Sequence, residues 1–373
     1  MATRHYLRHA LFLALFIALN SSESGPVSIV STAEASPARQ RTIINRLQSQ
    51  NRRFRRQNQQ FRRQNLDLRR NLNLALRPAP APDPEPTPFI EMVRVDNPRN
   101  APDSGNTSEP GVYGSVPYEF EIGKYPVTMD QYTAFLNAVA AEDTYELYHT
   151  SMAHNAAVAG ILRTGAPGSY SYTVSGSGMR PIAFVSWFNA ARFCNWLHND
   201  RPTGPQDAST TETGAYELNG ALSGVGFERQ WGAKFWIPSE DEWYKAAHHD
   251  PRTSAEGGPP GDDHYWLYPT QSDSAPTAEA PPGGGNSANF NNAVEALTDA
   301  GAYGNSPSFY GTYDQAGNVY EWNDAVINGD SRGLRGGAWV SVDSILRSTN
   351  RADNEPDRKT NRLGFRVAGP ASP

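Results

Sequence analysis

The chain has 373 residues, of which 11% are aromatic, and a formal net charge of −6, so it can bury one large core or two modest ones. Its only cysteine is Cys194, which excludes an intrachain disulfide framework. Residues 36–77 hold twelve arginines against one acid, Asp67, which gives +11 and leaves −17 for residues 78–373 because the first 35 residues cancel.

The first 35 residues have the features of a secretory signal. Arg4 and Arg8 precede an apolar run from Ala10 to Leu19, and Ala33-Glu34-Ala35 offers a cleavage site with small residues. A run of about ten residues is too short to cross a bilayer as a helix. We therefore expect a signal peptide at 1–35, a secreted, periplasmic or cell-surface protein, and no transmembrane span after cleavage. An uncleaved anchor is the alternative.

Residues 36–77 carry a seven-residue repeat that predicts a coiled-coil arm. Two positions of the repeat, three residues apart, suit the a and d sites of a parallel coiled coil. Asparagine residues at the a sites fix the register and the oligomer state. We expect homo-oligomerisation through residues 44–75. The a positions are Ile44, Asn51, Asn58, Asn65 and Leu72, and the d positions are Leu47, Phe54, Phe61, Leu68 and Ala75.

The arm has two other interpretations. Arginines with interleaved aromatics can bind nucleic acid, but export and the regular heptad argue against that partner, so none is expected. A disordered cationic arm that touches an acidic cell-surface polymer remains open.

Six prolines alternate through residues 78–88, PAPAPDPEPTP. Alternating proline favours an extended, semi-rigid backbone, and eleven residues at about 3.1 Å each would span roughly 35 Å. We expect a linker between the arm and a head at 89–369.

The head shows local signals for a strand and three helices. Phe120 and Ile122 alternate as in a strand. Three residues suit helix N-caps: Thr128 with Gln131 three residues later, Ser186, and Ser239 in a capping box with Glu242. The expected buried helix positions are Tyr132, Phe135 and Leu136, then Ala190, Cys194 and Leu197, then Trp243 and Ala246. Cys194 is therefore expected to be a small core residue, not a nucleophile.

Several segments read as loops. Residues 253–263 and 271–290 are rich in Gly, Pro and Ser. Residues 143–178 and 200–233 are candidates for a variable ligand surface. The residues His248, His249, Asp250 and His264 could bind zinc, but their spacing matches no defined site, so a solvated loop is the preferred interpretation.

Five motifs, in order, resemble the formylglycine-generating enzyme (sulfatase-modifying factor) family. They are YEFEIGKYPVTMDQYTAFLNAV, RPIAFVSWFNAARFCNWLHN, FWIPSEDEWYKAA, YGTYDQAGNVYEWNDA, and the segment framed by RGG and GFR. The resemblance implies an α+β, C-type-lectin-like fold with much irregular structure, here preceded by the helical arm.

The resemblance also implies structural calcium. At the fourth motif, the matching ligands are Asp314, the carbonyls of Gly317 and Val319, and Glu321. Oxygen donors of this kind suit a hard cation. The alternative is a glycine turn whose acids are merely solvated.

A second calcium site of the family uses an asparagine followed by a carbonyl. Asn289 and Phe290 match those positions, with Asp299 the nearest candidate for the carboxylate.

The fifth motif runs from Arg335-Gly336-Gly337 to Gly364-Phe365-Arg366, the latter aligned with the terminal strand of the family. In catalytic members two cysteines between these ends bind copper, and they fall here on Ser341 and Leu346; the serine that handles oxygen falls on Ala338. Copper(I) needs soft thiolate ligands, so copper is not expected.

These substitutions predict a pseudoenzyme, an exported binding or structural protein with a protein or cell-surface polymer as ligand. The alternative is a formylglycine-generating oxidoreductase that acts on protein cysteine in sulfatase maturation through unrecognised residues.

Overall fold

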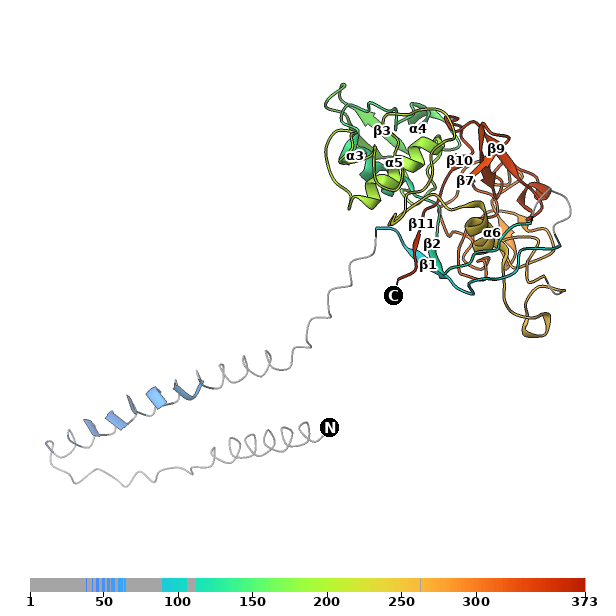
Figure 1. The fold of residues 1–373 in the computed structure, drawn as a ribbon. Helices are drawn as coiled ribbons and strands as arrows, with labels where there is room; N and C mark the ends of the chain where they lie inside the picture. Colours follow the sequence, from blue (N-terminus) through green and yellow to red (C-terminus); the bar gives the residue numbers. More distant parts are fainter. Residues whose placement is uncertain are drawn as a thin grey trace. The chain divides into compact units, whose positions relative to one another are not determined.

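The computed structural model describes residues 89–105, 112–261 and 263–372 of the head, and scattered residues between 38 and 64 (Figure 1). The chain divides into two compact units, Met1–Glu85 and Pro86–Pro373, a division that falls inside the predicted linker. The predicted signal segment 1–35 and the linker 78–88 themselves lie outside the described residues, so both stay predictions.

In the first unit, every described residue is helical. Of the predicted coiled-coil seam only Phe61 is described, and its side chain is exposed. Helix formation in the arm agrees with the heptad, whereas pairing between chains stays a prediction. None of the helices among the described residues is long and apolar enough to cross a bilayer.

Small sheets organise the described part of the head. A three-stranded sheet has the order β1-β2-β11, and a four-stranded sheet has the order β10-β7-β8-β9. The pair β3-β4 is antiparallel and the pair β5-β6 is parallel. The strands are β1 (Met92–Val95), β2 (Phe120–Gly123), β3 (Ile161–Thr164), β4 (Ser171–Val174), β5 (Thr277–Ala278), β6 (Ser287–Ala288), β7 (Tyr320–Ile327), β8 (Ser331–Arg335), β9 (Ala352–Asn354), β10 (Leu363–Gly364) and β11 (Ala368–Pro370).

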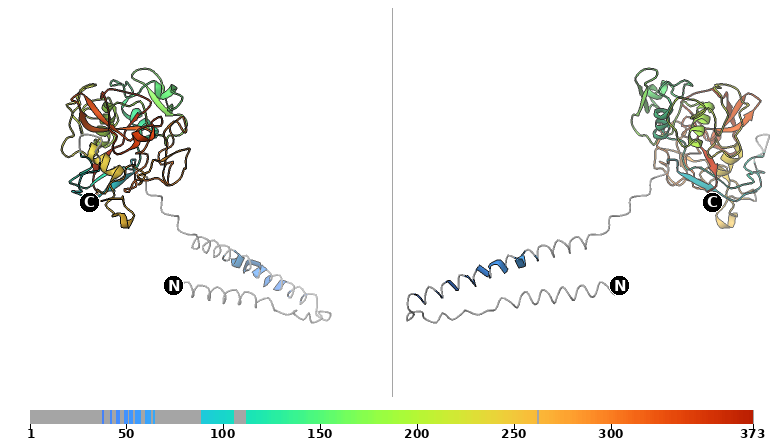
Figure 2. Two further views of the ribbon diagram at one scale, coloured as in Figure 1. Left: turned by 90° about the vertical axis from the view of Figure 1, so that its right-hand side faces the viewer. Right: turned by 60° about the vertical axis from the view of Figure 1, so that its left-hand side comes forward.

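Capping chemistry sets where the longer helices begin. The side chains of Thr128, Ser186 and Ser239 each accept a backbone N–H three residues on, as the sequence predicted. The helices are α3 (Met129–Val139), α4 (Ser151–His154), α5 (Trp187–His198), α6 (Glu240–His248) and the short 3₁₀ helices η2 (Ser254–Glu256) and η3 (Asp343–Leu346). Helices α3 and α5 lie on the side of the head that carries the β3-β4 hairpin (Figures 1 and 2), and the start of α5 also meets the larger sheet, since the Arg332 guanidinium on β8 lies 4.0 Å from the centre of the Trp187 ring.

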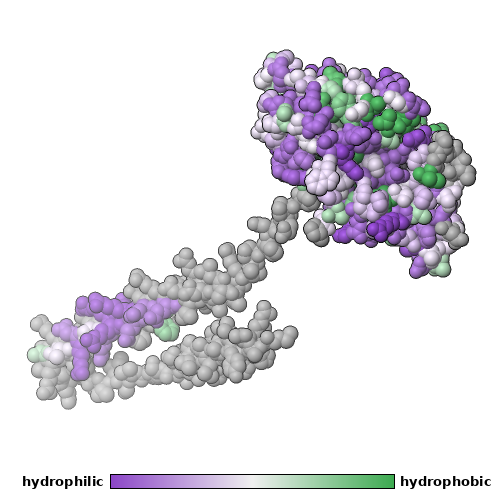
Figure 3. Space-filling model, viewed as in Figure 1, coloured by the Kyte–Doolittle hydropathy of each residue, from purple (hydrophilic) through white to green (hydrophobic). Residues whose placement is uncertain are grey.

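The main core lies among α3, α5 and the two larger sheets. Phe120, Ile122 and Cys194 are fully buried there, so the predicted strand and the structural role of the cysteine are confirmed. Six of the eight tryptophans are buried, whereas Trp231 is fully exposed. The face of the head drawn in Figure 3 is mostly hydrophilic, with separate apolar areas.

Phe89 fixes the start of the head. Its ring packs edge-on against Trp196 with 5.6 Å between ring centroids, and the Arg201 guanidinium lies 4.7 Å from the ring centre. Its carbonyl accepts a hydrogen bond from Gln131 Nε2 at 2.8 Å. The first residue of the head is thereby tied to α3 and α5, ahead of β1.

Two expectations about elements were wrong. Residues 143–178 are not a plain loop, because they form α4 and the β3-β4 hairpin. The terminal strand does not cover 364–366: β10 ends at Gly364, and β11 begins at Ala368. Arg366 lies between them, where the Phe365 and Val367 carbonyls accept bonds from Val127 N and Gly123 N and the Arg366 side chain turns inward to the Glu321 carboxylate.

Candidate functional site

The RGG turn brings the fifth motif against the fourth. Gly336 and Gly337 both have positive φ, 91° and 72°, a region that glycine adopts without strain. A Cβ on Gly336 would lie 2.6 Å from the Gln315 carbonyl oxygen, and the Gly336 carbonyl accepts a bond from Gly317 N at 2.8 Å. The two glycines therefore permit a close approach that larger residues would block.

The positions that correspond to the catalytic cysteines meet at Gly337. A Cβ built on Gly337 would lie 3.4 Å from Ser341 Cβ and 2.9 Å from Leu346 Cδ1. Ala338 N donates to Ser341 Oγ at 3.0 Å, and Ser341 N donates back to the Ala338 carbonyl at 2.8 Å. The RGG turn thus places the Ser341 hydroxyl and the Leu346 isobutyl group at the positions where the resemblance would put two thiols.

Leu346 fills its position completely. It is buried in a small apolar cluster with Tyr268, Ala288, Phe290 and Ala316. Neither leucine nor a serine hydroxyl is a soft metal donor. Cys194 offers no substitute, because it lies on α5 in the main core, where burial raises the pKa of its thiol well above the ordinary value.

Glu321 does not fit a calcium ligand in this geometry. Its carboxylate accepts bonds from Arg366 Nε at 2.5 Å, Arg366 Nη2 at 2.7 Å and Trp243 Nε1 at 2.6 Å. Both members of the ion pair are fully buried. A guanidinium in direct contact already neutralises the carboxylate and opposes a second cation beside it.

The other predicted ligands of this site lie in the turn before β7. Asp314 Oδ2 accepts a bond from Gly301 N at 2.6 Å, and loss of hydration raises the pKa of Asp314 to about 6. Gly317 lies in the turn against Gly336, and Val319 is buried directly before β7. Unlike Glu321, the Asp314 carboxylate forms no ion pair with an arginine or lysine among the described residues.

Asn289 fits a cation better. Its Nδ2 donates to the Ala296 carbonyl at 2.8 Å and to Asn318 Oδ1 at 3.2 Å, which orients the amide. Its Oδ1 and the Thr298 Oγ1 are then buried oxygens with no hydrogen-bond partner among the described residues. Unsatisfied buried oxygens suit a hard cation such as calcium. Asn289 Oδ1 and the Phe290 carbonyl are the atoms that would hold it.

His248, His249 and Asp250 of the histidine cluster are buried and do not lie in a solvated loop. His248 Nδ1 pairs with the Trp266 carbonyl and His249 Nδ1 with Tyr310 Oη. Burial lowers the pKa of both histidines to about 3, so they stay neutral. Asp250 is paired with Arg252. Within the ranges that the structure describes, no group of three His, Cys, Asp or Glu side chains is placed to bind a metal.

Two cavities are lined by residues other than Ala338, Ser341 and Leu346, and Tyr320, which lines the second, lies close to Ser341. The first, about 640 Å³, is lined by Tyr145, Glu146, His149, Ser186, Leu222, Glu355, Asp357, Arg358 and Lys359. The second, about 460 Å³, is lined by Tyr320, Leu334, Ala352, Asp353, Asn354, Arg358, Thr360, Asn361, Arg362 and Leu363. Arg358 lines both cavities. Sequence reasoning missed these residues, although the Asp357-Arg358-Lys359 run inside the fifth motif could have drawn attention to them.

Comparison with known proteins agrees with the motifs. The profile of the sulfatase-modifying factor enzyme 1-like domain matches residues 82–371. Inactive C-alpha-formylglycine-generating enzyme 2 of Bos taurus is 28% identical over 210 residues, 52% of this chain and 54% of that protein. The Mus musculus protein of the same name is 27% identical over 210 residues, with 52% and 53% covered. The chain therefore spans about half the length of these curated relatives.

Among solved structures, Treponema denticola variable protein 1 is similar over 75% of this chain and 95% of its own, with 20% identity and a TM-score of 0.43. The α+β organisation expected from the resemblance is confirmed by the few helices and small sheets of the head. Because the domain profile covers most of the chain, the protein belongs to the sulfatase-modifying factor enzyme 1-like (FGE-sulfatase) family.

Proposed function

We propose that this protein is an exported, non-catalytic binding or structural protein, whose family head is carried on a basic, oligomerising arm. The placement of Ser341 and Leu346 against Gly337 is the observation that carries the proposal. The backbone frame of the family is kept there, while the side chains offer one hydroxyl and one buried alkyl group. Relatives that are themselves described as inactive are consistent with this proposal.

The proposal is tested by an oxidation assay. The full-length protein would be incubated with copper, oxygen and a cysteine-containing sulfatase-motif peptide, and aldehyde formation followed by mass spectrometry. An active family member run in parallel shows that the assay works. We expect no conversion above the protein-free rate. Sustained turnover by this chain would instead support the oxidoreductase with unrecognised residues.

The arm is proposed to join copies of the chain. Its described residues are helical, and the arginines among them, Arg46, Arg52, Arg53, Arg55, Arg56 and Arg62, are exposed. Sedimentation at about 0.15 M salt, where charge repulsion beyond roughly 8 Å is screened, should show an oligomer that becomes monomeric on deletion of 36–77. An unchanged mass would remove the oligomerisation proposal. Loss of cell retention by the same deletion, with the mass unchanged, would favour anchoring to an anionic surface polymer.

A further inference from the structure

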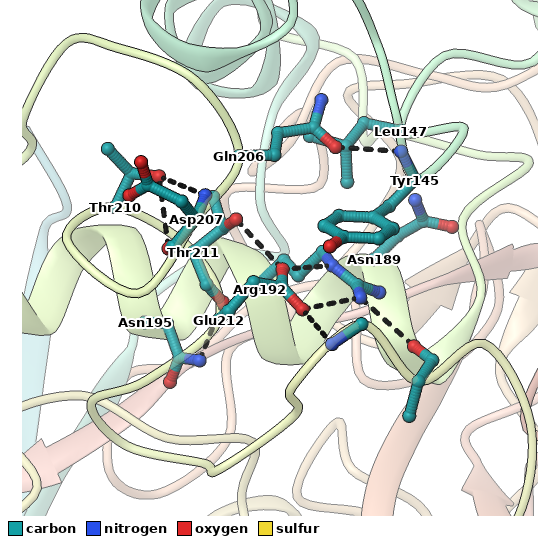
Figure 4. A network of polar contacts seen from close by, with 12 residues as sticks. Tyr145, Leu147, Asn189, Arg192, Asn195, Gln206, Asp207, Thr210, Thr211 and Glu212 are labelled. Carbon is teal, nitrogen blue, oxygen red and sulfur yellow. Dashed lines mark hydrogen bonds and ion pairs between the residues drawn. The ribbon is translucent and has the colours of Figure 1, made fainter.

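The described arginines of the arm differ from the buried arginines of the head. Arg192 on α5, for example, is fully buried and donates from Nε and Nη2 to the two oxygens of Glu212, at 2.7 and 2.9 Å, beside the Tyr145 ring (Figure 4). The described arginines of the arm are exposed, and their side chains form no hydrogen bond or ion pair with any described residue. Their guanidinium groups are therefore available to a second molecule.

The two flanks of the predicted seam differ in charge. In the heptad that places asparagines at a, the e positions are Gln48, Arg55, Arg62 and Arg69, and the g positions are Gln50, Gln57, Gln64 and Asn71. The flanking residues that the structure describes are Gln50, Arg55, Gln57, Arg62 and Gln64, and all of them are helical and exposed. Phe61, at a d position, is 58% exposed. The helix thus carries guanidinium groups on one flank of its seam and neutral amides on the other.

A parallel pair of arms matches these flanks. In a parallel coiled coil the g residues of one chain lie beside the e residues of the next heptad of the other chain. Gln50 would then lie beside Arg55 of a second copy, and Gln57 beside Arg62. The glutamine carbonyl can accept a bond from the guanidinium, and such a bond from a charged donor is stronger than one between neutral groups.

An antiparallel pair would mismatch the same residues. It would bring one e flank against another, so that arginines meet arginines, and the asparagines at a against phenylalanine and leucine at d. Like charges repel, and a buried amide without a partner is unfavourable. Register follows from the same layers. A shift of one heptad in a parallel pair would place Asn51 against Ile44 and Asn65 against Leu72, whereas without a shift the asparagines meet each other.

We propose that the arm pairs with a second copy of itself in parallel and in register, through a ladder of bonds from the e arginines of each chain to the g glutamines of the other. This inference rests on the proposed oligomerising arm and adds the contact surface, the orientation and the register. Because the chains run in the same direction, both heads leave the coil at the same end.

The sign of a glutamate substitution tests the orientation. Gln50→Glu, Gln57→Glu and Gln64→Glu are combined in the full-length protein, and the dissociation constant is measured by sedimentation at about 0.15 M salt. In the parallel pair the new carboxylates meet arginines, so we expect the dissociation constant to fall by about tenfold or more. In an antiparallel pair the carboxylates would meet one another, so a dissociation constant that rises would overturn the proposal.

The matched control adds the same charge on the outer face of the helix. Asn45→Glu, Ser49→Glu and Gln60→Glu replace three exposed residues at b, f and c positions, away from the seam. Each set turns three neutral residues into glutamates, so a general relief of the positive charge of the arm affects both variants alike. We expect the control to lower the dissociation constant much less than the g variant does. Equal effects of the two sets would overturn the ladder.

A cysteine cross-link measures the orientation without a change of charge. Cys194 is the only natural cysteine and is fully buried in the main core, so a thiol introduced into the arm is the only exposed one. Leu47→Cys lies at the first d position of the seam. Under oxidised glutathione it should give disulfide-linked chains on non-reducing electrophoresis, because equivalent d positions meet in a parallel pair in register. An assembled Leu47→Cys protein without this cross-link would contradict the proposal.

The outcomes separate this inference from the proposed function. An oligomer that the g glutamates weaken would keep the oligomerising arm and remove the parallel ladder. A wild-type chain and a g variant that are both monomeric would remove the oligomerising arm as well. Neither result bears on the oxidation assay, which tests the head.

Discussion

The Glu321–Arg366 pair gives the sharpest test of how the head is held together. Glu321→Gln keeps the side-chain shape but leaves the fully buried Arg366 without its counter-charge. Breaking one partner of a buried pair costs about 3–5 kcal/mol. The amide oxygen can still accept two of the three bonds, those from Arg366 Nε and Trp243 Nε1 that meet at one carboxylate oxygen, so we expect a loss of about 3 kcal/mol, at the low end of that range. For a domain of this size that corresponds to roughly 5 °C in melting temperature.

The measurement is urea and thermal unfolding of the full-length protein, followed by tryptophan fluorescence and circular dichroism. Glu355→Gln is the matched control, since Glu355 is exposed and has no ion pair among the described residues, and it should change stability by less than 0.5 kcal/mol, about the size of an ordinary surface effect. A loss below about 1 kcal/mol for Glu321→Gln would refute the reasoning. If chelation lowers the melting temperature of the wild type but not of Glu321→Gln, the carboxylate belongs to a metal site after all.

Three further predictions concern other residues. Leu346→Ala should cost about 2–5 kcal/mol in urea unfolding because it opens a cavity in the small apolar cluster, whereas Leu346→Met should cost less than about 1.5 kcal/mol; equal costs would contradict the packing. Chelation should lower the melting temperature of the wild type, and Asn289→Ala should abolish that response, which isothermal titration with calcium would check directly; an Asn289→Ala protein that still responds would exclude this ligand. Burial raises the pKa of Asp324 to about 7, above its ordinary 3.8, although Arg332 Nη1 lies 2.9 Å from its carboxylate and opposes the shift, so between these pH values the folded state binds more protons than the unfolded state. The free energy of unfolding should therefore fall as pH rises from about 4 to 7, and Asp324→Asn should flatten that slope in urea titrations; an unchanged slope would point to other groups.

Local chemistry was predictable from the sequence. The starts of α3, α5 and α6 follow from Thr128, Ser186 and Ser239, because an N-cap and its partner lie within four residues of each other. The RGG turn was identifiable for a similar reason, since two adjacent glycines permit two left-handed residues in succession. The absence of thiols at Ser341 and Leu346 was also predictable, because both positions are found by counting along the sequence from that turn.

Long-range pairing was not predictable in the same way. Glu321 and Arg366 are 45 residues apart, and each was assigned to a separate motif, so nothing local indicated that they neutralise each other. The cavity likewise joins Tyr145, Ser186 and Lys359 from three distant segments. His248 and His249 were expected in solvent because Gly and Pro follow them, whereas the burial of the end of α6 encloses both.

Phe89 gives the head a mechanical property. Tension applied through the arm enters the head at this residue, where Trp196, Arg201 and Gln131 hold the ring and the carbonyl. The load is thereby shared with α3 and α5 before it reaches the four paired residues of β1. Under such a load the contacts of Phe89 would have to break before β1 could be peeled from β2, so they would shield the strand pairing of the head.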